Sequence, residues 1–138
     1  MKRYLLDTSI LIDFINRRFG VEKRAEEVRQ AGGVIGTSLP VVGECFYGIE
    51  GSDNPVYYRK LFLRGLYRVT RWPFTHEAAE AYGTIANELK KTGRLIQQID
   101  MQTAAIAHTL GNCTIVTTDS DFNRIPGIVT ENWRTTSS

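Results

Sequence analysis

The chain has 138 residues, of which 42% are hydrophobic, and a formal net charge of +2 at pH 7. This size predicts one globular domain at residues 1–134, followed by a short polar tail at residues 135–138. No run of about 18 apolar residues is present, so a membrane-spanning helix is not expected. Asp7 and Asp13 interrupt the apolar N-terminal stretch, which argues against a signal peptide and favours a cytoplasmic protein.

Apolar segments alternate with helical segments along the chain. Strands are predicted at residues 4–6, 34–36, 114–116 and 128–130, and the segment 69–72 is a weaker candidate. Helices are predicted from residue 8 onward and at 22–30, 38–50, 56–66, 75–91 and 100–111. This alternation indicates an α/β fold, a three-layer α/β/α sandwich with a central, mostly parallel sheet of about five strands.

The two cysteines, Cys45 and Cys113, argue against a zinc site. Neither lies in a paired spacing such as CxxC. We therefore expect both to be reduced thiols in the core.

Four acidic residues lie where the predicted segments begin or end, namely Asp7, Glu44, Asp100 and Asp119. Asp7 and Asp119 follow predicted strands, so both are expected at the carboxyl edge of the sheet, where functional groups gather. Glu44 and Asp100 would join them from helices. Carboxylates beside core-forming segments cost desolvation free energy, so a converging group needs a cation. Oxygen ligands favour Mg²⁺ or Mn²⁺.

The remaining charges are mostly basic. Outside these four acids and Asp121, seventeen basic residues accompany ten acidic ones, a surplus that attracts polyanions. Tyr57, Lys60 and Arg64 share one helical face, which suits an RNA backbone with an aromatic platform for a base. A solvated helix face is the simpler alternative. The same choice applies to Lys90, Lys91 and Arg94.

Four stretches of sequence carry a more specific signal: "LLDTSILID", "TSLPVVGECFYGI", "IDMQTAAIAHTLG" and "IVTTDSDFNRIPGIVTENW". In this order they resemble the VapC type of PIN-domain protein, from the N-terminus through Trp133. The resemblance implies a metal-dependent ribonuclease that is the toxin of a toxin–antitoxin pair. It makes Asp7, Glu44, Asp100 and Asp119 the catalytic and metal-binding quartet, with Asp121 as an extra carboxylate of outer or no role.

The expected chemistry is hydrolysis of an RNA phosphodiester bond by water that one or two Mg²⁺ or Mn²⁺ ions activate. Asp7 and Asp100 are the principal expected ligands. The spacing after "TIVTT" leaves open whether Asp119 or Asp121 lies nearer the metal. Thr103 departs from the branched aliphatic residue that the family often has there, which bears on substrate shape more than on chemistry.

Each acid also has a simpler structural role. Asp7 and Asp100 could cap helices, Asp119 and Asp121 could form a turn, and Glu44 could reach solvent. For the whole chain, the alternatives are a DNA nuclease or other metal-dependent phosphoesterase, and a PIN-fold binding module without catalysis. The intact quartet favours catalysis.

The resemblance further implies a VapB-like antitoxin whose tail covers the acidic site, and a homodimer. Apolar side chains on the early helices could form a groove for a partner helix or could belong to the core. They are Leu11, Phe14, Ile15, Phe46, Tyr47 and Ile49.

Overall fold

A computed structural model describes residues 1–93 and 96–135. Its strands form one parallel sheet in the order β3-β2-β1-β4-β5. The strands are β1 (Arg3–Leu6), β2 (Val34–Ser38), β3 (Thr70–Trp72), β4 (Cys113–Val116) and β5 (Val129–Glu131). All five predicted strands are present, and the weaker candidate at 69–72 is the edge strand β3.

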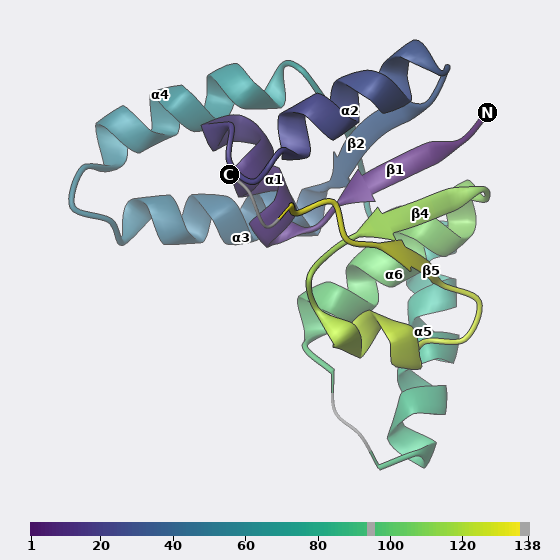
Figure 1. Cartoon of the computed structure of the whole chain (residues 1–138). Coiled ribbons are helices and arrows are strands. Elements are labelled where there is room, and N and C mark those ends of the chain that lie inside the picture. The colour runs from purple at the N-terminus through teal and green to yellow at the C-terminus, as the bar shows by residue number, and fades with distance from the viewer. Residues whose placement is uncertain (94–95, 136–138) are drawn as a thin grey trace.

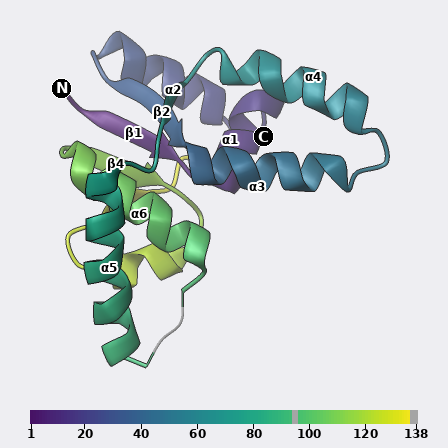
Figure 2. The same cartoon turned by 180° about the vertical axis from the view of Figure 1, so that it is seen from behind.

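Helices cover both faces of the sheet, which confirms the three-layer sandwich (Figure 1). They are α1 (Thr8–Asn16), α2 (Val21–Gln30), α3 (Leu39–Glu50), α4 (Pro55–Leu66), α5 (His76–Lys91) and α6 (Gln98–Leu110), with a 3₁₀ helix η1 (Ser120–Arg124). In Figures 1 and 2, α1 and α2 lie on one side and α5 and α6 on the other. The hairpin of α3 and α4 projects beyond the sheet.

The central strand β1 is buried on both faces. Tyr4 and Leu6 belong to the apolar cluster that α1 and α2 cover, whereas Leu5 belongs to the cluster beneath α5 and α6. Successive strand residues point to opposite faces, so an unbroken apolar run is needed here. Asp7, which follows β1, is therefore attached to a strand that packs against apolar side chains on both faces.

Two helices, α1 and α4, approach each other closely. Gly65 of α4 lies against Ile15 of α1, with no room for a Cβ atom at position 65. This contact brings the C-terminal turn of α4 against the C-terminal turn of α1.

Some details differ from the sequence-based expectations. Helix α6 begins at Gln98 with Gln97 at its N-cap, so Asp100 lies in the first turn and is not the cap. Thr135 is the one residue of the predicted tail that the structure describes, and its backbone N–H donates to the carbonyl of Phe19 at 2.8 Å. Residues 136–138 and Arg94 lie outside the described residues.

The cysteines and the helices can be compared with expectation within the described ranges. Both cysteines are free thiols, with Cys45 buried and Cys113 half-buried. No helix there has the length and apolar character needed to cross a membrane.

Candidate active site

Asp7 stands at the junction of β1 and α1. Its backbone N–H donates to the carbonyl of Val116 at 2.9 Å, which joins it to the end of β4. Asp7 is the N-cap residue of α1 but shows no side-chain capping hydrogen bond, and its Oδ2 accepts from the hydroxyl of Thr117 at 2.9 Å. Asp7 therefore occupies the N-cap position considered for it, while the bond from Thr117 holds its carboxylate at the carboxyl edge of the sheet.

The loop after β4 continues this hydrogen-bonded chain. The Thr117 hydroxyl accepts from the backbone N–H of Asp119 at 2.9 Å. Oδ1 of Asp119 accepts from the backbone N–H of Asp121 at 2.9 Å and so caps η1. The turn considered for these two acids is present, yet it occupies only one oxygen of Asp119. Thr117 was not expected here, and its only sequence signal is a hydroxyl directly after an apolar strand.

Asp100 approaches the same loop from the first turn of α6. Carboxylate oxygens of Asp100, Asp119 and Asp121 all lie within 4.8 Å of one another. Asp100 is 8% exposed, although a carboxylate is costly to bury. The structure thus brings Asp119 and Asp121 equally into the group that contains Asp100.

A buried pair of hydroxyls docks α6 onto the sheet. Oγ of Ser38 lies 2.9 Å from Oγ1 of Thr103, and both residues are fully buried. Ser38 also caps α3, since its Oγ accepts from the backbone N–H of Val41 at 3.3 Å. Thr103, the residue that departs from the family pattern, therefore joins the helix of Asp100 to the segment that leads to Glu44.

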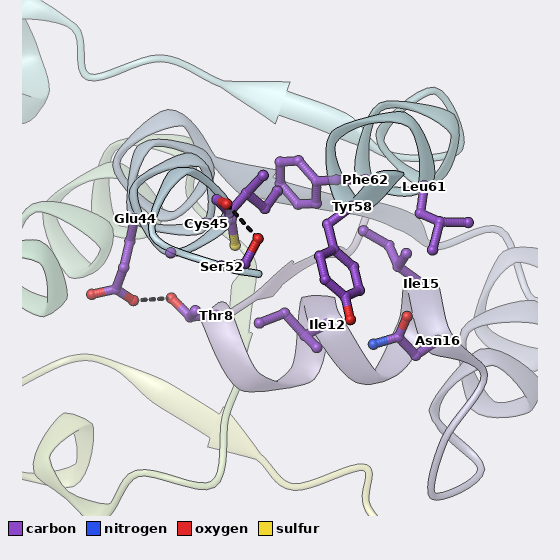
Figure 3. Close-up of a pocket in the computed structure, with 12 residues that line it drawn as sticks. Thr8, Ile12, Ile15, Asn16, Glu44, Cys45, Ser52, Tyr58, Leu61 and Phe62 are labelled. Atoms are coloured by element: carbon purple, nitrogen blue, oxygen red, sulfur yellow. Dashed lines mark hydrogen bonds between the residues drawn. The ribbon is translucent and has the colours of Figure 1, made fainter. Parts of the chain in front are cut away.

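Glu44 lies on α3 and faces α1. Its Oε1 accepts from the hydroxyl of Thr8 at 2.5 Å (Figure 3). It stands outside the close group of three acids. Its charge nevertheless raises the pKa of both Asp7 and Asp100.

The electrostatics of the cluster are repulsive. Burial raises the pKa of Asp100 to about 7, and the neighbouring charges of Asp7, Asp119, Glu44 and Asp121 add to the effect. Burial also raises the pKa of Asp7, against the hydrogen bonds from Thr8 and Thr117. The carboxylates therefore destabilise one another in their charged forms.

A divalent cation suits this arrangement. In the described part of the chain, Asp121 pairs with Arg124 at 3.3 Å, and no lysine or arginine pairs with Asp7, Glu44, Asp100 or Asp119. The ligand atoms are carboxylate oxygens, which hard cations prefer.

An apolar groove of about 380 Å³ adjoins the acidic cluster between α1, α3 and α4. Thr8 and Glu44 lie at one end and Ile15 and Leu61 at the other (Figure 3). Of the six apolar residues considered for a partner groove, Leu11 and Phe14 are core, Ile15, Phe46 and Ile49 are partly buried, and Tyr47 is 84% exposed. Of these six residues, Ile15 and Ile49 line the groove, together with Ile12, Tyr58 and Phe62.

The predicted basic track lies on α4, away from the acids. Tyr57, Lys60 and Arg64 are all exposed. The ring of Tyr57 meets that of Tyr58 edge to face, with centroids 5.4 Å apart. Tyr58, and not Tyr57, lines the groove beside the acidic cluster.

Comparison with known proteins assigns the family. The family model described as the PIN domain matches residues 4–128. The chain belongs to the PIN-domain family. A ribonuclease VapC2 from Haemophilus influenzae is 33% identical to this PIN-domain chain over 133 residues, which are 96% of the chain and 99% of the relative. The expected membership of the VapC type is thereby confirmed.

Two further relatives extend this result. A tRNA(fMet)-specific endonuclease VapC from Shigella flexneri is 26% identical to the PIN-domain chain, over 96% of the chain and 99% of the relative. A solved VapBC2 structure from Rickettsia felis, bound to a DNA fragment from its promoter, has a TM-score of 0.88 and 28% identity. That match covers 95% of the PIN-domain chain and 98% of the solved chain.

Proposed function

We propose that this PIN-domain chain is a metal-dependent endoribonuclease and the VapC-type toxin of a toxin–antitoxin pair. The observation that carries the proposal is the cluster of carboxylates at the carboxyl edge of the sheet, where Asp100, Asp119 and Asp121 approach within 4.8 Å. Asp7 and Asp100 are both buried, so their charges need a counter-ion. The ribonuclease names of its relatives support RNA as the substrate.

Each side chain of the cluster has a distinct part in this proposal. Asp100, Asp119 and Asp121 would hold Mg²⁺ or Mn²⁺, with Asp7 and Glu44 completing the site directly or through water. When bound, one or two such ions acidify a water molecule and neutralise the charge that develops on the phosphate. Thr117 orients Asp7 and Thr8 orients Glu44 through their hydroxyls.

Because the pKa of Asp100 is raised to about 7, this carboxyl group is partly protonated at neutral pH before a cation binds. Ligand carboxylates must be deprotonated to bind a metal ion, so a bound ion displaces that proton. Cation affinity is therefore proposed to increase as the pH rises through 7.

A small antitoxin of the VapB kind is the proposed partner, because the Rickettsia felis neighbour is solved as a VapBC2 complex. The apolar groove beside Glu44 is a suitable surface for it. Homodimer formation is proposed from the family resemblance.

The test is cleavage of total cellular RNA by antitoxin-free protein in Mg²⁺, in Mn²⁺ and in chelator. We expect cuts only with a cation, and a loss of at least about 100-fold in rate for Asp100→Asn. Asp53→Asn is the matched control, because Asp53 is an exposed loop acid. Cleavage that persists in chelator or in Asp100→Asn would contradict the proposal. Cleavage of DNA with RNA left intact would favour a DNA nuclease instead.

A further inference from the structure

A second hollow lies at the opposite end of α1 from the acidic cluster. It has a volume of about 280 Å³, and Ile15, Leu61 and Gly65 line it together with three arginines, Arg17, Arg64 and Arg68. Ile15 and Leu61 also line the far end of the apolar groove (Figure 3). The groove therefore leads from the acidic cluster directly to a basic hollow, which we call the arginine hollow.

The charge of the arginine hollow is only partly neutralised. Glu22 pairs with Arg68 at 2.7 Å and with Arg17 at 3.4 Å. Arg64 forms no ion pair with any residue in the described ranges. One carboxylate thus pairs with two of the three guanidinium groups, which leaves a surplus of positive charge at the hollow.

The arginine hollow is also partly preorganised. The guanidinium of Arg68 lies over the ring of Phe14, 4.6 Å from its centroid, in addition to its pair with Glu22. The contact of Gly65 with Ile15 fixes α4 against α1 and so sets Arg64 beside the end of α1. Guanidinium groups match the geometry of phosphate oxygens, and groups already held in place lose less entropy when they bind.

The spacing of the two sites suits a nucleic acid strand. Helix α1 (Thr8–Asn16) separates them and has nine residues, which is a length of about 13–14 Å. A stacked strand advances about 3.4 Å per nucleotide, and an unstacked strand advances further. A strand with one phosphate at the acidic cluster would place another phosphate, about two to four nucleotides away, in the arginine hollow.

We infer that the arginine hollow binds a backbone phosphate of the same single-stranded RNA that is cut at the acidic cluster. This inference rests on the proposed ribonuclease function. The intervening bases lie in the apolar groove, where Tyr58 offers a partly exposed ring for stacking. An acidic peptide would satisfy the arginines as well, but it carries no bases to stack on Tyr58 in the apolar groove.

The test measures RNA binding without cleavage. All proteins carry Asp100→Asn, and the probe is a fluorescein-labelled oligouridylate long enough to reach from the acidic cluster to the arginine hollow. Anisotropy across a salt series gives the affinity and its salt slope. Arg64→Gln and Arg17→Gln should each weaken binding about five- to tenfold at low salt and flatten the slope by about 0.7. Glu22→Gln should tighten binding.

Two controls isolate the arginine hollow. Arg59→Gln removes an exposed arginine from the same helix, α4, whose guanidinium lies over Phe46 outside the hollow, and it should change affinity less than about twofold. A labelled UpU dinucleotide is too short to span the two sites, so it should bind more weakly than the oligouridylate and lose less affinity on Arg64→Gln.

The outcomes separate the inference from the proposed function. Equal losses for Arg64→Gln and Arg59→Gln, or no gain for Glu22→Gln, would overturn the arginine hollow as a phosphate site while the nuclease remains. Failure of the parent protein to bind any RNA would overturn both. Competition by polyglutamate as effective as by unlabelled oligouridylate would assign the hollow to an acidic peptide.

Discussion

The two ends of α1 carry opposite charge and are built differently. At the N-terminal end, Asp7 is buried and held by the ends of β1 and β4, and it has no basic partner in the described part of the chain. At the C-terminal end, Arg17 is largely exposed and shares Glu22 with Arg68. The free energy of a buried charge without a partner depends strongly on the ion or ligand that binds it, whereas exposed charges are screened by water. Substitutions at the acidic end should therefore have much larger effects.

The largest expected contrast is between Asp7→Asn and Arg17→Gln in RNA cleavage. Asp7→Asn should reduce kcat/KM by at least about 100-fold, because it removes a carboxylate that completes the proposed metal site. Arg17→Gln should reduce kcat/KM by no more than about tenfold, mainly through KM, because its contact is made in the ground state and in the transition state alike. Steady-state cleavage of one RNA substrate by both variants measures this. Comparable losses in kcat would contradict the distinction between the two ends.

A smaller effect is expected from the hydroxyl pair that docks α6. Thr103→Val leaves the buried hydroxyl of Ser38 without this partner and should lower the free energy of unfolding by about 1–2 kcal/mol. The corresponding fall in Tm is about 3–8 °C. A double-mutant cycle with Ser38→Ala isolates the pair, since the loss of the α3 cap cancels. A coupling free energy near zero in urea unfolding would mean that the two hydroxyls contribute independently.

A further contrast concerns the pH dependence of stability at the acidic end. The pKa of Asp100 is raised from 3.8 to about 7, so the folded state binds more protons than the unfolded state within that window. Stability in chelator should therefore fall as the pH rises from about 4 to about 7. In Asp100→Asn the fall should be shallower. Urea unfolding at a series of pH values gives both curves, and parallel curves would show that Asp100 does not carry this effect.

The acidic site at the N-terminal end of α1 could be predicted from the sequence in part. Asp7 and Asp119 follow apolar strands, and parallel strands end at one edge of a sheet, so their convergence was predictable. Glu44 and Asp100 reach that edge through helix packing. The family resemblance identified Glu44 and Asp100 more clearly than their spacing in the sequence did.

The arginine hollow as a whole had no comparable signal, although Arg64 was considered as an RNA contact on another helical face. Arg17 ends α1, Glu22 begins α2, and Arg64 and Arg68 lie in and after α4, so no periodicity joins them. The close packing of Gly65 on Ile15 brings α4 to α1, and Glu22 of α2 joins them through Arg17 and Arg68. The buried pair of Ser38 and Thr103 was equally hidden, because hydroxyls are as common on surfaces as in cores.

The most direct test of the central claim is a calorimetric titration of the antitoxin-free chain with Mn²⁺, beside the Asp100→Asn and Asp53→Asn variants. We predict that the wild-type protein and Asp53→Asn bind Mn²⁺ alike. We predict that Asp100→Asn binds it at least about tenfold more weakly, as expected for a lost carboxylate ligand. Equal affinity in all three proteins, or no binding by folded wild-type protein, would contradict the assignment of the acidic cluster as a metal site.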